Sequence, residues 1–217
     1  KISADTAHFR QLAGLPGTQQ DGWLPIEHHM ESIVASINKY SISGVRSPPG
    51  SGKTMTLPDL LYAWAEKHTR RGWQGWPQAV VIVFPTQYGC LKIKESLLDF
   101  RGHDSSTVVL RTGVDKDDVF YKGVTKFQIV TYGMMWHWLV KSGPETYENL
   151  FEHNCAFLLD EFSGKAAGGD PQQLAADPQT MEIARLLAGF VLANPQTHRL
   201  LVTGASLDQD LMNAVLP

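Results

Sequence analysis

The sequence predicts an α/β fold, a mostly parallel β-sheet with helices on both faces. Six short apolar runs of strand length recur along the chain, and helical patterns lie between most of them. The runs are largely continuous rather than alternating, which is typical of strands that are buried on both faces. Strands that alternate with helices favour one parallel sheet with right-handed crossovers. The predicted strands are residues 41–46, 79–84, 107–111, 127–131, 156–160 and 199–203.

The predicted helices alternate with these strands. The first begins at Leu24-Pro25-Ile26 and carries apolar side chains from Met30 to Ile37 at the spacing of an amphipathic helix. Residues 164–178 lack apolar periodicity, so we expect a flexible surface loop there. Ligands of parallel sheets collect at the carboxyl ends of the strands, and we expect the functional residues at that edge. The other predicted helices are residues 55–67, 89–100, 133–141 and 179–193.

Composition limits the classes of protein that the chain fits. Hydrophobic residues make up 43% of the 217 positions, enough for a buried core. The net charge of −3 gives no global basic field, so any nucleic-acid site must be a local groove. Two cysteines without CxxC spacing argue against a disulfide framework or a zinc site.

The chain has no apolar run near the ~20 residues that span a bilayer, and no signal-peptide pattern opens it. We therefore expect an intracellular protein, cytoplasmic or nuclear, that is not secreted. The sequence starts at Lys1 without methionine and stops at Pro217, so we expect a piece of a longer protein. Its organisation is expected to be a lead-in segment, residues 1–23, and one domain, residues 24–217.

A glycine-rich loop at residues 47–54 follows the first predicted strand and opens the next helix. Glycines let the backbone curl so that successive N–H groups point at one anion, and the helix N-terminus favours negative charge. Lys53 is expected to reach the β- and γ-phosphates, and the Thr54 hydroxyl is expected to hold Mg²⁺. Ser47 departs from the glycine of the usual motif, and a chance loop with a solvated lysine is the alternative. The residues expected to bind the nucleotide are Pro49, Gly50, Ser51, Gly52, Lys53, Thr54 and Met55.

Two acids end a later strand, and they fit the same chemistry. Asp160 is expected to bind Mg²⁺, and Glu161 to orient and deprotonate the water that attacks the γ-phosphorus. Adjacent acids after an apolar run also occur by chance as a solvated turn. Together with the glycine loop they predict nucleoside triphosphate hydrolysis, with Lys53 and Glu161 as the catalytic pair. We expect both groups in one pocket on neighbouring strands.

These motifs and four others resemble the first RecA-like domain of superfamily 2 helicases, in particular the DEAH-box group and its viral DExH relatives. The resemblance covers nearly the whole chain, from residue 24 onward. It implies a RecA-like P-loop NTPase domain of an ATP-dependent RNA helicase, with ATP as substrate, Mg²⁺ as cofactor and a second RecA-like domain in the parent protein. The matching segments are residues 24–38, 47–58, 84–87, 129–135, 158–163 and 202–208.

The resemblance also implies a site for single-stranded nucleic acid, RNA rather than DNA. Thr86, Gln87 and Thr131 would face the strand and bind phosphates without reading bases. The arginines common after the first of these positions are missing, so the groove is less basic than usual. Arg111 and Lys92 are candidates to supply charge, with a solvated surface cation as the alternative for each.

Departures from the family pattern fall on the link between hydrolysis and nucleic-acid movement. Phe162-Ser163 stands where the family has Ala-His, Gly204 replaces a serine and Ser206 replaces a threonine. The implied coupling residues are therefore Ser163, Gly204 and Ser206. Two alternatives follow: a nucleotide-binding scaffold or sensor that has lost coupling, or a DNA translocase.

Overall fold

The computed structural model describes residues 24–69, 79–114, 124–142, 150–152, 154–162 and 178–216. The predicted lead-in segment and most of the predicted loop at residues 164–178 lie outside these ranges. The strands are β1 (Ile42–Arg46), β2 (Ala79–Phe84), β3 (Val108–Arg111), β4 (Phe127–Thr131), β5 (Asn154–Leu159) and β6 (Arg199–Gly204). The main helices are α2 (Met30–Lys39), α3 (Lys53–Thr69), α4 (Gln87–Glu95), α5 (Tyr132–Trp136), α7 (Pro178–Ala193) and α8 (Gln209–Val215).

All six strands form one parallel sheet in the order β1-β6-β5-β2-β4-β3, which confirms the predicted fold class. The register aligns the carboxyl ends of adjacent strands: Phe84 pairs with Thr131, and Val45 pairs with Thr203. The polar residues that follow these strands therefore meet at one edge of the sheet.

One detail of the predicted arrangement is wrong. The strand that precedes the glycine loop, β1, and the strand that precedes the acid pair, β5, are not neighbours, because β6 lies between them. The α3 helix, which follows the glycine loop, nevertheless packs against β5 and β2, and this brings its first residues to the acid pair.

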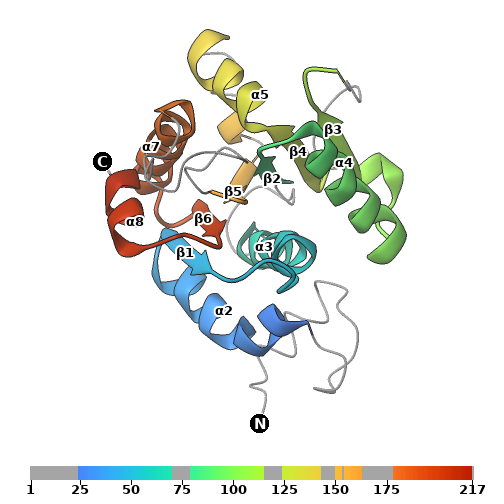
Figure 1. Cartoon of the computed structure of the whole chain (residues 1–217), viewed down its shortest axis with the longest axis horizontal. Helices are drawn as coiled ribbons and strands as arrows, with labels where there is room; N and C mark the ends of the chain where they lie inside the picture. The colour runs from blue at the N-terminus through green and yellow to red at the C-terminus, as the bar shows by residue number, and fades with distance from the viewer. Residues whose placement is uncertain are drawn as a thin grey trace.

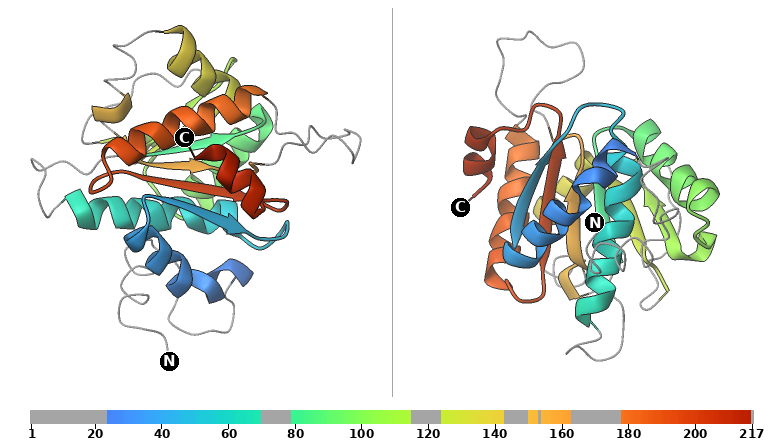
Figure 2. Two further views of the ribbon diagram at one scale, coloured as in Figure 1. Left: turned by 90° about the vertical axis from the view of Figure 1, so that its left-hand side faces the viewer. Right: turned by 90° about the horizontal axis from the view of Figure 1, so that it is seen from below.

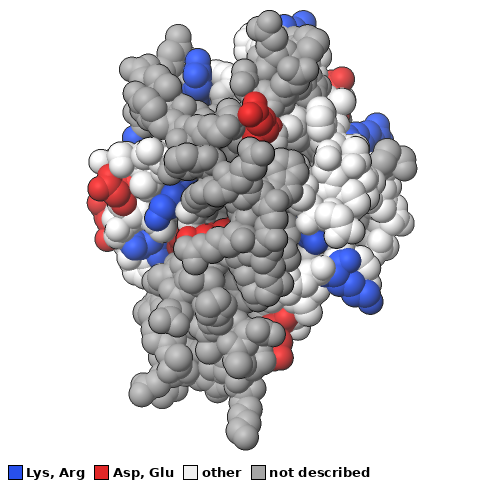
Figure 3. All heavy atoms as spheres, turned by 180° about the vertical axis from the view of Figure 1, so that it is seen from behind, with Lys and Arg blue, Asp and Glu red and all other residues white. Residues whose placement is uncertain are grey.

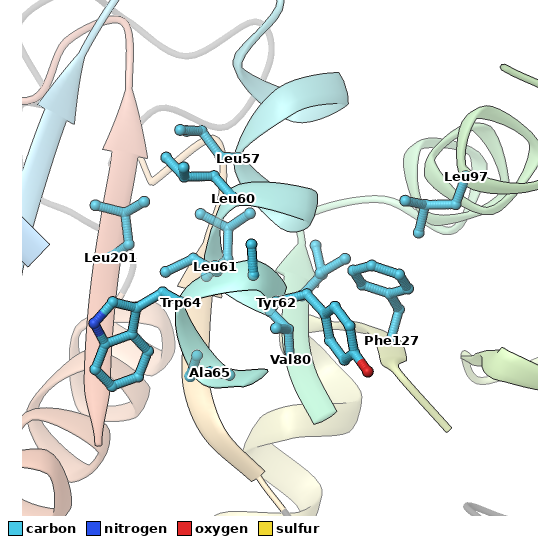
Figure 4. Close-up of a cluster of buried hydrophobic side chains, with 14 of the residues drawn as sticks. Leu57, Leu60, Leu61, Tyr62, Trp64, Ala65, Val80, Leu97, Phe127 and Leu201 are labelled. Carbon is cyan, nitrogen blue, oxygen red and sulfur yellow. The ribbon is translucent and has the colours of Figure 1, made fainter. Parts of the chain in front are cut away.

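The helices cover both faces of the sheet, as Figures 1 and 2 show. On one face, α2, α3 and α4 pack against a cluster that includes Leu61, Trp64 and Phe127 (Figure 4). On the other face, α5, α7 and α8 pack against a second cluster that includes Phe157, Phe162 and Leu187. The runs that form β2, β4, β5 and β6 are thus buried on both sides, as their continuous pattern predicted, whereas the edge strand β1 is largely half-buried or exposed.

Helix starts and ends differ from the prediction for local reasons. The α4 and α5 helices begin at residues 87 and 132, earlier than expected, because Thr86 and Thr131 cap them. Each continues into a five-residue π-helical segment, Ser96–Phe100 and His137–Lys141. The first predicted helix opens with a 3₁₀ segment, Pro25–His29. Within the described residues, no helix is both long and apolar enough to span a membrane.

Candidate nucleotide-binding site

The glycine loop joins β1 to α3 at the carboxyl edge of the sheet. Gly50 and Gly52 have φ values of 77° and 89°, a left-handed conformation that favours glycine. At Gly52 a side chain would also collide with Leu24, since an ideal Cβ would lie 2.6 Å from Leu24 Cδ1. The Ile26 N–H donates to the Ser51 carbonyl at 2.9 Å, so the chain before α2 holds the loop from outside. Pro49 and Gly50 are exposed at the tip of the loop.

The serine at the first motif position has a structural role. Ser47 is buried and its hydroxyl lies 2.9 Å from that of Ser51, which is also buried. This hydrogen bond ties the two ends of the loop together. The departure from glycine is therefore compatible with a closed loop.

Four side chains from the loop and the acid pair meet above the sheet. The Lys53 ammonium lies 2.9 Å from Glu161 Oε1, with the lysine side chain 4% exposed and the glutamate 35% exposed. The Thr54 hydroxyl donates to Asp160 Oδ2 at 2.6 Å. Residues more than a hundred positions apart in sequence thus share one site. Met55 follows Thr54 in the first turn of α3.

Asp160 is fully buried and lies at the centre of this hydrogen-bonded group. Its Oδ1 accepts from the Thr203 hydroxyl and from the Glu161 N–H, the latter at 2.8 Å. Burial raises the pKa of Asp160 above its ordinary value, although the donated hydrogen bonds act in the opposite direction. Tyr132 donates its hydroxyl to the Asp160 carbonyl at 3.1 Å, and burial followed by the charges of both acids raises the pKa of that phenol.

Thr203 and Tyr132 were not among the site residues predicted from sequence. Thr203 lies in β6, and Tyr132 directly follows β4. The sequence pattern that could have identified them is their position, since each stands at the carboxyl end of a predicted strand. Their side-chain directions, which decide that they meet Asp160, required the packed structure.

The backbone at Glu161 has φ of 51°, the one positive φ at a non-glycine residue among those described. Such a conformation is uncommon outside glycine, asparagine and aspartate, and it costs on the order of 1–3 kcal/mol. Glu161 lies two residues after the end of β5, and its side chain is directed toward Lys53. Strain of this kind persists where the surroundings over-determine the conformation, which is common at functional sites.

Asp160→Asn should raise the free energy of unfolding at neutral pH by about 1 kcal/mol, because functional sites commonly sacrifice stability. The folded-state pKa of this acid is raised by burial, so its contribution to stability is fully present below the ordinary aspartate pKa. That contribution is lost as pH rises through the folded-state pKa. In chemical denaturation, the free energy of unfolding of the variant should therefore exceed that of the wild type chiefly at pH 8, and little at pH 4. An equal difference at both pH values would contradict this account.

The glycine of the last motif is explained by a close backbone approach. An ideal Cβ at Gly204 would lie 2.7 Å from the carbonyl oxygen of Phe162, and the Phe162 N–H donates to the Thr203 carbonyl at 2.7 Å. Phe162 itself is fully buried. The segment after the acid pair therefore rests directly on the end of β6, where a serine side chain would not fit.

Gly204→Ser should lower the free energy of unfolding by about 1–3 kcal/mol, the usual cost of forcing a side chain into packed surroundings. Equilibrium urea denaturation measures this change. Ser206→Ala is the matched control, since Ser206 is exposed two residues further on and its truncation should have little effect. If Gly204→Ser were as stable as wild type, the backbone contact with Phe162 would not constrain this position.

Of the other two predicted coupling residues, Ser206 lies among the described residues. Ser206 lies exposed in the turn before α8. Ser163 lies outside the described residues, so its implied coupling role stays a prediction.

The predicted nucleic-acid residues stand at the ends of β2 and β4. The Thr86 hydroxyl accepts from the Gly89 N–H at 3.0 Å, and the Thr131 hydroxyl accepts from the Met134 N–H at 3.2 Å. Both threonines are thus helix N-caps, and Gln87 is exposed beside the first of them. The N-cap role accounts for a threonine at each position without any ligand.

The two candidate basic residues are both engaged with neighbours. Lys92 forms an exposed ion pair with Glu95 at 2.6 Å. Arg111 ends β3 with its guanidinium 6.0 Å from the ring of Trp138, which packs against the second core cluster. On the face shown in Figure 3, basic and acidic side chains are interspersed among the described atoms.

The donors of the site fit a magnesium nucleotide. A hydroxyl and a carboxylate oxygen that already meet, Thr54 and Asp160, are the hard oxygen ligands that Mg²⁺ prefers, usually alongside substrate phosphates and water. No group of three or more His, Cys, Asp or Glu side chains able to hold a metal occurs in the described part of the chain. A magnesium ion at this site would thus take some of its oxygen ligands from a phosphate group and from water.

The sequence matches no protein-family model and no curated protein. Solved structures of helicases share its fold at low sequence identity. The DEAH/RHA helicase HrpB from Escherichia coli has a TM-score of 0.62 and 17% identity over 87% of this chain. A second HrpB structure, described as a DExH-box NTPase, has a TM-score of 0.65 and 17% identity over 93% of this chain. The UvsW helicase from bacteriophage T4 has a TM-score of 0.59 and 12% identity over the full chain.

The match covers 20% and 22% of the two HrpB chains and 69% of the UvsW chain. The chain thus spans about a fifth of the length of HrpB. At these identities the comparison establishes the fold. The chain has the RecA-like α/β fold of these helicase domains, a single parallel six-stranded sheet with helices on both faces.

Proposed function

We propose that the chain is the ATP-binding and hydrolysing motor domain of an ATP-dependent RNA helicase. The observation that supports this proposal most strongly is the meeting of Lys53, Thr54, Asp160 and Glu161 at the carboxyl edge of the sheet. A phosphate-binding loop beside two acids that end a buried strand is the arrangement that phosphoryl transfer to water needs.

Each residue has a distinct role in this proposal. The loop N–H groups and Lys53 bind the phosphates, and Thr54 and Asp160 hold Mg²⁺, which neutralises charge on the β- and γ-phosphates when bound. Glu161 orients the attacking water and accepts its proton. Glu161 is paired with Lys53 in the structure, so binding of a phosphate to Lys53 would break that ion pair and release the carboxylate.

The proposed partners are single-stranded RNA at the edge formed by Thr86, Gln87 and Thr131, and a second RecA-like domain of the parent protein. An arginine supplied from such a domain is worth a factor of ~10³ or more in related phosphoryl-transfer enzymes. We therefore expect this chain by itself to bind ATP–Mg²⁺ and to hydrolyse it slowly.

The test combines calorimetric titration of ATP–Mg²⁺ with ATPase assays in the presence of RNA or DNA of the same sequence. Affinity for ATP–Mg²⁺ and stimulation by RNA support the proposal. Nucleotide binding without stimulation by either polymer would favour a scaffold or sensor, and stimulation by DNA alone would favour a DNA translocase. Absence of any nucleotide affinity would refute all three assignments.

A further inference from the structure

A buried charge cluster on the side of α3 lies outside the site described so far. Asp59, on α3, is 1% exposed and faces two basic side chains from the segment after α4. Arg101 Nε lies 3.4 Å from Asp59 Oδ2, and His103 Nε2 lies 2.6 Å from Asp59 Oδ1. The Arg101 side chain is itself 1% exposed. Burying such charges costs free energy unless they are paired, so Asp59 and Arg101 each depend on the other to stay buried.

Arg101 also reaches the first turn of the nucleotide helix. Its Nε donates to the Met55 carbonyl at 3.2 Å, and its Nη2 lies 3.5 Å from the Thr56 hydroxyl. Met55 directly follows Thr54, the proposed magnesium ligand. The guanidinium therefore joins the backbone beside the metal-binding residue to the buried carboxylate one turn further along α3.

The first turn of α3 lacks one of its internal hydrogen bonds. Pro58 lies inside α3 and has no N–H, so it cannot bond the carbonyl four residues earlier, which is that of Thr54. A helix that is interrupted in this way depends on outside partners to hold its geometry. The donor from Arg101 is such a partner, one residue from the interruption.

We propose that Arg101, oriented by Asp59 and His103, is a positioning residue that holds Thr54 in place to bind magnesium. This inference rests on the proposed function, because it assigns Thr54 the role of metal ligand. A guanidinium suits the task, since its Nε donates to the Met55 carbonyl while its positive charge lies beside the Asp59 carboxylate. Phe100 supports this orientation from the exposed side, with its ring 5.0 Å from the guanidinium carbon.

The arrangement also connects the two functional edges of the domain. The helical rod formed by α4 and the π-helical segment after it runs from the Thr86 cap to Phe100, directly before Arg101. At about 1.5 Å per residue, fourteen residues span roughly 20 Å. Thr86 stands at the proposed nucleic-acid edge, so one continuous helical element has this edge at one end and the helix of the nucleotide site at the other.

The experiment measures how much Mg²⁺ increases affinity for ATP, as the ratio of the dissociation constants in EDTA and in Mg²⁺. One variant is Arg101→Lys, which keeps a positive charge near Asp59 but loses the fork. The other is the double variant Asp59→Asn with Arg101→Met, which removes the buried charge pair and so avoids an unpaired carboxylate. Asp99→Asn is the matched control, since Asp99 is exposed at the same end of the rod.

We expect the magnesium-dependent gain to fall about tenfold in the double variant and less in Arg101→Lys. Affinity in EDTA should stay within about twofold of wild type in both, because Lys53 and the loop are unchanged. A purely structural role would change the melting temperature but leave this ratio intact. The inference is overturned if both variants fold and keep the wild-type ratio. A wild-type chain that binds no nucleotide would instead refute the proposed function, and this inference with it.

Discussion

Replacing Glu161 by glutamine should abolish hydrolysis and leave nucleotide binding intact. A general base contributes about 10²–10⁴-fold to a reaction rate, and glutamine has no comparable basicity. The substitution should also strengthen binding slightly, because it removes the negative partner that lies 2.9 Å from the Lys53 ammonium. The expected signature is therefore a fall of about 10²–10⁴ in the single-turnover rate, with an unchanged or lower dissociation constant for ATP–Mg²⁺.

The control for this variant is Glu31→Gln, which neutralises an exposed carboxylate on α2 that takes no part in the proposed site. It should change neither the rate nor the dissociation constant. Hydrolysis that persists in Glu161→Gln within threefold of wild type would show that another group activates the water. A large loss of binding would show that Glu161 organises the loop instead.

Replacing Lys53 by methionine, unlike Glu161→Gln, should act on binding and weaken nucleotide affinity about 10–100-fold. A hydrogen bond to a charged group contributes about 1.5–3 kcal/mol, and 1.4 kcal/mol corresponds to a tenfold change in affinity. Methionine matches the length of the buried lysine stem, so the site should stay packed. Glu161 is 35% exposed and can be solvated once its partner is gone. Fluorescence titration with a labelled ATP analogue measures the change.

Lys39→Met provides the comparison for this measurement, since Lys39 is exposed at the end of α2. An equal loss of affinity in both variants would indicate a non-specific charge effect. Full affinity in Lys53→Met would place the triphosphate somewhere other than the glycine loop.

The fold could be predicted because its signals are local. Continuous apolar runs such as residues 79–84 and 127–131 define buried strands whatever their neighbours are, and the structure gives both with these bounds. The order of the strands in the sheet is not local. The sequence therefore gave no indication that β6 separates β1 from β5, and the expected adjacency was wrong.

The residues of the site could be predicted from sequence motifs, but the contacts between their side chains could not. Lys53 and Glu161 could be chosen from motifs, but their ion pair depends on the positive φ at Glu161, which no pattern reports. Gly204 looked like a loss of function from sequence, whereas the structure gives it a steric reason, the carbonyl of Phe162. Asp59 and Arg101 carry no motif, because their pairing depends on how two distant helices pack.

The capping threonines also limit what these two positions can recognise. A threonine hydroxyl has one hydrogen and two lone pairs, and in each cap a helix amide takes one of the lone pairs. The hydroxyl hydrogen remains available for donation to an acceptor, such as an oxygen of a sugar–phosphate chain. Starting a helix therefore leaves a hydrogen-bond donor at the end of each of these two strands.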